Sequence, residues 1–401
     1  MAHNKTKYRL LLLVPAFCIY LFVAAQPIPV ETILVPQWLS SLESNYTVYF
    51  DRSSPAGTSF GARSNGVSPE SGVIETRVAD VADSGETDDE ADTGNPDTSN
   101  LRSFTLGNRF GYIDTAGKFV INQVKKEKLS ISGDYWAEYE ARPARVEVRN
   151  PRNNTVAVLE DPKGYPLFLD NRIFLINNEQ HSLQAVDASG KILWNYDFAA
   201  PITDMDAAAG LVLAGFLDGT VELLDESGKR IFFFEPVGSR LAVIYGCRIS
   251  RDGSWLAIIS GYDNQRFLLL ERSENSYKVV YHEFLSKGFR RDIHIAFIDH
   301  DRRVVFEREG GLGIYDINTR NSVQVALDGK INAIDGFGED DMLFVITSQS
   351  GTRKELVGIR LSGEIIMEAP FRSSVVFLGR QGKRLYVGGD ETLASFELNK
   401  R

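Results

Sequence analysis

Apolar and polar residues alternate in short runs over the last three hundred residues of the chain, and tight turns separate the runs. The pattern is clearest in residues 182–194, SLQAVDASGKILW, and in residues 220–232, TVELLDESGKRIF. Alternation with a period of two predicts strands with one buried face, and the Asp-x-Ser-Gly-Lys turn predicts that two such strands form an antiparallel hairpin. The two segments superpose without a gap, because Asp187 and Asp225 are 38 residues apart.

Weaker copies of this hairpin continue in both directions along the chain, and further pairs of strand-like runs lie between them, such as residues 210–216 and 253–260. One hairpin and one such pair make a four-stranded sheet, and a period near forty residues predicts a β-propeller. The equivalent positions are 35 to 46 residues apart and are Asp114, Arg149, Asp187, Asp225, Glu271, Asp316, Arg360 and Glu397.

The predicted fold is therefore all-β, with a single propeller over residues 101–401. We expect about seven four-stranded blades, with eight as the alternative if the first hairpin is a blade of its own. The last period ends at Lys400 and Arg401, just after its third strand. We expect a strand within residues 104–124 to fill this gap, because closing the ring removes an exposed sheet edge.

The recurring aspartates and glycines of the turns have a structural explanation. Asp hydrogen-bonds backbone groups two residues further on, and Gly adopts a positive φ without steric cost. We assign a structural role to eight turn residues: Asp114, Gly117, Asp187, Gly190, Asp225, Gly228, Asp316 and Gly363.

The N-terminus has the pattern of a segment that directs the chain across a membrane. Residues 1–9 form a basic region with Lys5, Lys7 and Arg9, and residues 10–25 are apolar. Positive charge before an apolar run predicts a signal-anchor or the core of a cleaved signal peptide. We favour a transmembrane anchor, which makes the propeller extracytoplasmic, or periplasmic in a bacterium; after cleavage the protein would be secreted.

Two segments of different character lie between the apolar run and the propeller. Residues 26–50 form a juxtamembrane segment, in which Trp38 is expected at the membrane interface, on a partner, or in a short helix. The composition of residues 51–100 predicts a disordered acidic linker, because the segment from Glu75 to Asp97 contains nine Asp or Glu residues and only one basic residue, Arg77. We expect this linker to be a flexible tether between the anchor and the propeller.

The sequence offers little catalytic chemistry. There is no Gly-x-Ser-x-Gly elbow and no phosphate-binding loop, and Cys247 is the one cysteine outside the apolar run, so no disulfide is available to the propeller. His294 and His300 could bind a metal with Asp299 and Asp301, but polar residues at a blade rim are the favoured explanation. We therefore predict no catalytic residue, no cofactor and no metal.

Charge narrows the possible partners. The net charge is −10 and no basic stripe is present, which argues against nucleic acid. Charged turns such as Arg290, Arg291 and Asp292 are candidates for recognition, but a solvated rim is the favoured explanation. The glycines between Gly310 and Gly313 fit a hairpin and not a phosphate cradle.

The two clearest hairpins resemble the repeats of quinoprotein-type (PQQ-like) propellers, whose unit ends in an Asp-x-x-x-Gly-x-x-x-Trp phrase. Elsewhere the strand pattern is similar to WD40-type blades, and residues 108–120 resemble a single WG-type repeat. Quinoprotein dehydrogenases hold their cofactor with a vicinal Cys pair and calcium-binding acids, which this chain lacks. The resemblance therefore implies the non-catalytic envelope propeller that scaffolds outer-membrane protein assembly.

The predicted function is a non-enzymatic, membrane-tethered scaffold that binds envelope proteins through loops on a rigid ring. The alternative is a sensor of a small ligand or glycan, or a vestigial PQQ-type quinoprotein. A resemblance between folds does not identify the partner.

Overall fold

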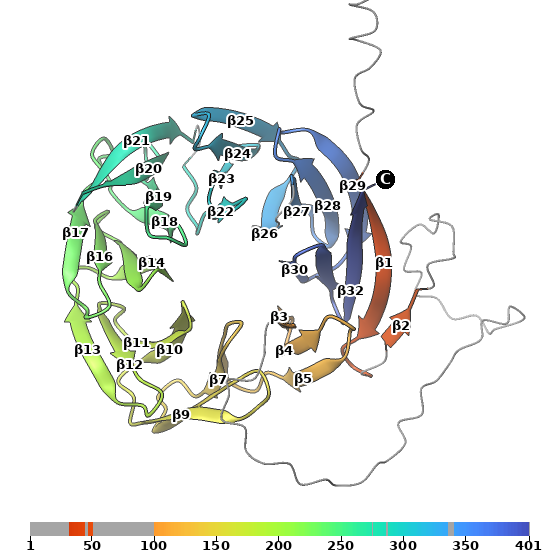
Figure 1. Ribbon diagram of the computed structural model, residues 1–401, viewed down its shortest axis with the longest axis horizontal. Helices are drawn as coiled ribbons and strands as arrows, with labels where there is room; N and C mark the ends of the chain where they lie inside the picture. Colours follow the sequence, from red (N-terminus) through yellow and green to blue (C-terminus); the bar gives the residue numbers. More distant parts are fainter. Residues whose placement is uncertain are drawn as a thin grey trace, which may run out of the picture.

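A computed structural model describes residues 32–44, 47–50, 100–274, 276–285, 288–335 and 341–400. Every regular element in these ranges is a β-strand, and the strands form eight sheets arranged around a ring (Figure 1). The predicted all-β propeller is confirmed. The number of blades is eight and not seven, because the first hairpin does form a sheet of its own. None of the described segments is a helix that could cross a bilayer.

Blades 1 to 4 follow the chain from residue 101. Blade 1 has three strands and the next three have four each. Their bounds are β3 (Leu101–Leu106), β4 (Arg109–Asp114) and β5 (Phe119–Val124); β6 (Lys128–Ile131), β7 (Trp136–Tyr139), β8 (Arg145–Arg149) and β9 (Thr155–Glu160); β10 (Tyr165–Leu169), β11 (Arg172–Ile176), β12 (Ser182–Val186) and β13 (Ile192–Asp197); β14 (Ile202–Ala208), β15 (Leu211–Phe216), β16 (Val221–Leu224) and β17 (Arg230–Phe234).

Blades 5 to 7 have four strands each, and blade 8 has five. Their bounds are β18 (Ile244–Ile249), β19 (Trp255–Ser260), β20 (Arg266–Ser273) and β21 (Ser276–Phe284); β22 (Ile295–Ile298), β23 (Arg303–Arg308), β24 (Gly311–Asp316) and β25 (Asn321–Ala326); β26 (Lys330–Asp335), β27 (Met342–Ser350), β28 (Arg353–Arg360) and β29 (Ile365–Arg372); β30 (Val376–Gln381), β31 (Arg384–Gly389), β32 (Thr392–Lys400), β1 (Thr32–Ser41) and β2 (Thr47–Tyr49).

Blade 8 closes the ring by joining the two ends of the described chain. Strand β1 pairs antiparallel with β32 from Thr32 opposite Lys400 to Ser41 opposite Thr392. The expectation that residues 104–124 supply the closing strand is wrong, because the strands in that region pair with one another to form blade 1. Closure uses the same principle as expected, an edge strand covered by a distant segment, but the segment comes from the other side of the acidic region.

This pairing also corrects the predicted order of the N-terminal segments. The juxtamembrane assignment of residues 26–50 is wrong from Thr32 onward, since β1 and β2 belong to the propeller. Residues 51–99 connect blade 8 to blade 1 and do not separate an anchor from the propeller, so their expected role as a tether is also wrong. The predicted membrane segment and the predicted disorder of the linker lie outside the described residues.

The hydrophobic core is divided among the junctions between blades. The described residues contain eight buried clusters, and each draws its side chains from two neighbouring blades. The junction of blades 8 and 1 contains Trp38 and Tyr386 from blade 8 and Phe104 and Ile113 from blade 1. No blade can bury its apolar faces alone, so the whole ring has to form for any junction to be complete.

In blades 1 and 4 a turn glycine packs closely against a tryptophan of the preceding blade. Gly228 has φ +78°, and a Cβ at this position would lie 2.5 Å from the Trp194 ring of the preceding blade. Trp194 Nε1 donates to the carbonyl oxygen of Glu226 in the same turn at 2.8 Å. Trp38 repeats this arrangement at the ring closure, where it packs on Gly117 and donates to the carbonyl of Thr115 at 3.4 Å.

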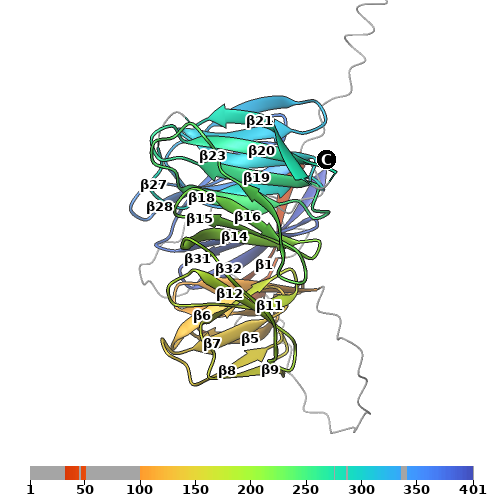
Figure 2. The ribbon, with the colours of Figure 1, turned by 90° about the vertical axis from the view of Figure 1, so that its left-hand side faces the viewer.

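The ring has two faces that differ in what they carry. Because neighbouring strands are antiparallel, Thr32, Phe50, Asn100 and Lys400 all lie on one side, which we call the terminal face. The turns β23–β24 and β27–β28 lie on the other side, which we call the cavity face. Figure 2 views the ring edge-on, with the C-terminus on the right-hand side.

Replacing Trp38 with alanine should lower the free energy of unfolding by about 3–5 kcal/mol, because the side chain is fully packed at the closing junction. Urea denaturation of the wild type and the variant measures this loss. Tyr49 is opposite Trp38 on β2 but 63% exposed, so Tyr49→Ala is the matched control and should change stability little. Equal effects of the two substitutions would show that β1 does not close the ring.

Candidate functional site

The cavity face contains a pocket of 520 Å³ where blades 5, 6 and 7 meet, which we call the rim pocket. The connection between β21 and β22, the end of β23 with its following turn, and the start of β26 form its walls. Glycines make up much of the wall, so backbone approaches the cavity closely. The lining residues are Gly288, Phe289, Arg290, Arg291, Glu307, Arg308, Gly310, Gly311, Gly329, Lys330 and Ile331.

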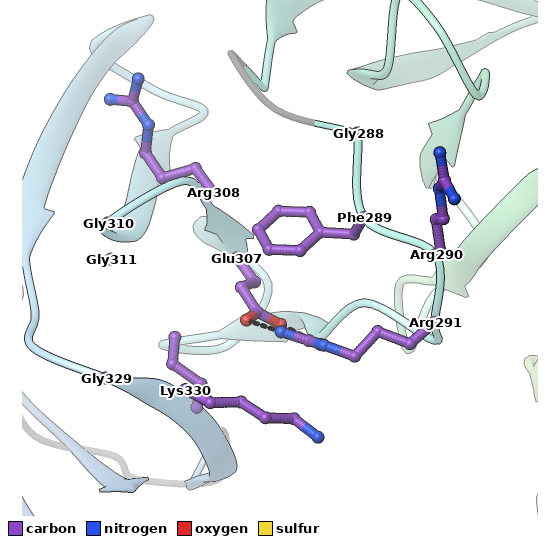
Figure 3. A pocket seen from close by; sticks show the side chains of 11 residues that line it. Gly288, Phe289, Arg290, Arg291, Glu307, Arg308, Gly310, Gly311, Gly329 and Lys330 are labelled. Carbon is purple, nitrogen blue, oxygen red and sulfur yellow. Dashed lines mark hydrogen bonds and ion pairs between the residues drawn. The ribbon is translucent and has the colours of Figure 1, made fainter. Parts of the chain in front are cut away.

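An ion pair between Arg291 and Glu307 forms the floor of the rim pocket (Figure 3). The Glu307 side chain is 3% exposed, and its Oε2 accepts from the Arg291 guanidinium at 2.9 Å. The same guanidinium lies 5.0 Å from the centre of the Phe289 ring. Hydrogen bonding to Glu307 raises the pKa of Arg291 above its ordinary value. This pair is bidentate and largely shielded from solvent, so it holds the pocket in shape.

His294 lies beside this floor. Its backbone carbonyl accepts from the Glu307 backbone N–H at 2.8 Å. Burial lowers the pKa of His294 below its ordinary value; nearby Arg291 and Arg248 lower it further, and Glu307 acts in the opposite direction. The imidazole is therefore neutral at pH 7.

A second cavity, of 780 Å³, opens on the same face among the innermost strands, and we call it the channel cavity. Blades 1, 2, 3, 7 and 8, whose positions around the ring are shown in Figure 1, contribute residues to it. Its lining mixes apolar side chains with three cations and no carboxylate. The residues are Thr105, Gly107, Arg109, Lys125, Leu129, Ser130, Ile131, Leu167, Phe168, Asn332, Lys354, Ser374, Val375 and Val376.

The two cavities adjoin at the start of β26. Lys330 and Ile331 line the rim pocket, and the next residue, Asn332, lines the channel cavity. Together the linings hold seven Lys or Arg side chains and one carboxylate, that of Glu307, in a protein of net charge −10. Asp292, Glu309 and Asp328 adjoin the rim pocket in sequence without lining it, so the excess of Lys and Arg is found in the linings themselves.

The eight turn residues predicted from the sequence lie away from these cavities, in turns on the terminal face. Asp225 Oδ1 accepts from the backbone N–H groups of Ser227 and Lys229 at 2.9 and 3.0 Å, and Asp187 is bonded in the same way. A hydrogen bond from Ser227 lowers the pKa of Asp225. Gly117, Gly190, Gly228 and Gly363 have φ between +78° and +95°.

The structure separates the residues considered for a metal site. His294 and His300 lie at opposite ends of β22, on opposite faces of the ring. Asp299 is buried and forms ion pairs with Arg302 and Arg303. Within the described ranges, no group of three or more His, Cys, Asp or Glu side chains is placed to hold a metal ion.

Sequence reasoning found part of the candidate site and missed part of it. Arg290 and Arg291 were candidates as a charged turn, and both line the rim pocket. Lys354 and Asn332 were missed, because Lys354 lies between the charged residues Arg353 and Glu355, and Asn332 is one polar residue within an otherwise ordinary strand. No local signal distinguishes a lysine that lines a channel from one that faces solvent.

A family model described as a beta-propeller protein matches residues 1–401. The chain belongs to this family. A protein of Treponema pallidum (strain Nichols), described as uncharacterized, is 27% identical over 379 residues, which cover 94% of this chain and 90% of that protein. The eight-bladed ring is therefore a member of a recognised propeller family, and its relative adds no stated activity.

Solved structures share the architecture at low sequence identity. BamB from Moraxella catarrhalis is similar with a TM-score of 0.50 and 15% identity, over 75% of this chain and 97% of BamB. The computationally designed Ika8 protein is similar with a TM-score of 0.56 and 14% identity, over 74% of this chain and 93% of that protein. At this identity the similarity shows the fold alone.

Replacing Arg291 with methionine should cost about 2–3 kcal/mol of stability, because it leaves the buried Glu307 carboxylate without its partner. The neighbouring Arg290 is exposed and forms no ion pair with any described residue, and its guanidinium lies over the Tyr262 ring, so Arg290→Met should cost only about 0.5–1 kcal/mol. Chemical denaturation of both variants checks the prediction. A neutral Arg291→Met variant would mean that the ion pair does not hold the pocket floor.

Stability should fall as the pH drops below the ordinary His pKa of about 6.5. The pKa of His294 is lower in the folded protein than in the unfolded chain, so the unfolded state takes up the proton first and is favoured as acid is added. Thermal melts of the wild type and His294→Gln between pH 7.5 and 5.5 measure this dependence. The variant should lose less stability over that interval, and parallel curves would contradict the assignment.

Proposed function

We propose that this propeller is a non-enzymatic scaffold of the cell envelope, tethered to a membrane by its N-terminus and binding a partner protein through the cavity face. One observation carries the proposal: β1 enters the propeller at the terminal face, opposite the two cavities. A tether at Thr32 leaves the cavity face open to a partner that approaches from the other side.

The sequence before Thr32 supports the tether. Basic residues precede the apolar run of residues 10–25, as in segments that direct the following chain out of the cytoplasm. Only residues 26–31 separate that run from β1. Six residues span at most about 20 Å, so an anchor would hold the terminal face close to the bilayer. The propeller would then be oriented, and would not drift on a long linker.

The construction of the ring supports a scaffold. Eight junctions and a closing strand give a rigid body, and recognition usually resides in loops on such bodies. The cavity face also exposes apolar side chains, among them Leu241, which is 60% exposed, and Val375 beside the channel cavity. Exposed apolar residues next to charged cavities are typical of protein-binding surfaces.

A photo-reactive amino acid at Leu241 or Val375 in living cells should give the same covalent adduct with one envelope protein. Lys191 and Lys229 are exposed in turns of the terminal face and serve as matched control positions, where the adduct should be absent. Gel shifts followed by mass spectrometry identify the products. Adducts from the control positions alone would overturn the orientation, and no adduct from any position would overturn the scaffold.

A further inference from the structure

Two polar groups of the channel cavity lack the partners that their chemistry requires. Lys354 is 6% exposed, and its ammonium donates to Ser348 Oγ at 2.9 Å and to the Gly351 carbonyl at 3.4 Å. No carboxylate of the described residues pairs with it. A buried ammonium without a counter-charge is costly, so an anion in the cavity would stabilise it.

The second group is an acceptor. The Oδ1 atom of Asn332 is buried, and no donor among the described residues reaches it. Buried polar atoms without a partner are rare in folded proteins. Asn332 lines the channel cavity, so a rotation of its side chain would bring the covered Oδ1 atom within reach of a donor there. The Lys354 ammonium in the same cavity requires an acidic acceptor.

These two requirements, together with the apolar lining of the cavity, favour a peptide ligand. A peptide supplies both groups, since a Glu or Asp side chain is the anion and a backbone N–H is the donor. Sulfate supplies acceptors only, and phosphate, which also carries a hydroxyl donor, has no apolar side chain. Apolar residues of the same cavity, including Leu129, Leu167 and Phe168, favour a ligand that also carries apolar side chains.

Cationic side chains of the rim pocket also favour an acidic ligand. Lys330 and Arg290 are exposed, and neither forms an ion pair with any described residue. Lys330 stands two residues before Asn332 on β26, between the two cavities. Figure 3 shows the side chain of Arg290 directed away from the Arg291–Glu307 pair and that of Lys330 below the pair. The Arg290 guanidinium lies 5.1 Å from the centre of the Tyr262 ring, a contact that leaves its charge unneutralised.

Building on the proposed scaffold function, we infer that the cavities bind an extended acidic segment of the partner protein. One carboxylate of the segment contacts the Lys354 ammonium, and a backbone N–H donates to Asn332 Oδ1 once that side chain rotates into the cavity. Lys330 and Arg290 attract further acidic residues of the segment at the rim. The Arg291–Glu307 pair does not contact the ligand charge, because its own charges are already matched.

Fluorescence anisotropy with the full-length protein in detergent tests this inference. The probe is a fluorescein-labelled decapeptide in which glutamate alternates with leucine and serine, and the matched probe has glutamine at each glutamate. Lys354→Met should weaken binding of the glutamate peptide by about tenfold, and Asn332→Leu by about threefold to tenfold. Lys229→Met, on the terminal face, should change binding by less than about twofold, because that charge is remote and screened.

If Lys354→Met does not unfold cooperatively in a melt, a second variant takes its place. The double variant Arg290→Gln and Lys330→Gln changes exposed side chains only, so it should fold as the wild type does. The affinity of this double variant for the glutamate peptide should be about tenfold lower than that of the wild type at low salt, and this difference should disappear at high salt.

Three outcomes would overturn the inference: equal binding of the two peptides, glutamate-peptide binding that none of the cavity variants weakens, or Lys354-dependent binding of dextran sulfate without binding of the peptide. The crosslinking experiment separates these results from the scaffold itself. Adducts at Leu241 and Val375 with no binding of the acidic peptide would leave the scaffold in place and remove the acidic segment.

Discussion

The structure depends on the contact between a turn glycine of one blade and the outer strand of the blade before it. Gly228 against Trp194 and Gly117 against Trp38 place a backbone with positive φ where a Cβ would overlap the indole. Each contact joins two sheets that share a hydrophobic cluster, and neither sheet can bury that cluster alone. Since the blades form a ring, the last junction depends on β1. The stability of the whole propeller therefore depends on a strand that is far in sequence from β32, the strand with which it pairs.

Closure by β1 also decides how the propeller can be used. The strand that completes blade 8 starts on the terminal face, so the chain before Thr32 leaves the ring opposite the two cavities. The segment between residues 51 and 99 becomes an insertion between blades 8 and 1. In the proposed function, a tether of about six residues would orient the rigid ring, whereas a tether of fifty residues would not. The proposed function follows from this geometry more than from any single side chain.

The turn residues and the cavity residues differ in how far the sequence reveals them. Asp225 and Gly228 act within one hairpin, through hydrogen bonds to Ser227 and Lys229, so a local pattern is sufficient to find them. Lys354 and Asn332 acquire their environment from strands of blades 1, 2, 3 and 8, up to 250 residues away. Arg291 lies between these cases, because its charge was visible in the sequence but its partner Glu307 was not.

By itself the sequence determined the repeating four-stranded unit, the all-β fold and the turns, because alternation and turn chemistry act over a few residues. The tertiary structure alone decided that the ring has eight blades, that β1 closes it, and that Trp38 is buried at the closing junction. Residues 32–41 form a hairpin only with the three-residue strand β2, and their other partner is β32 at the far end of the chain, so no local pattern reveals the pairing that closes the ring. The cavities too were decided by the tertiary structure alone, since their charged side chains come together only when the ring is complete.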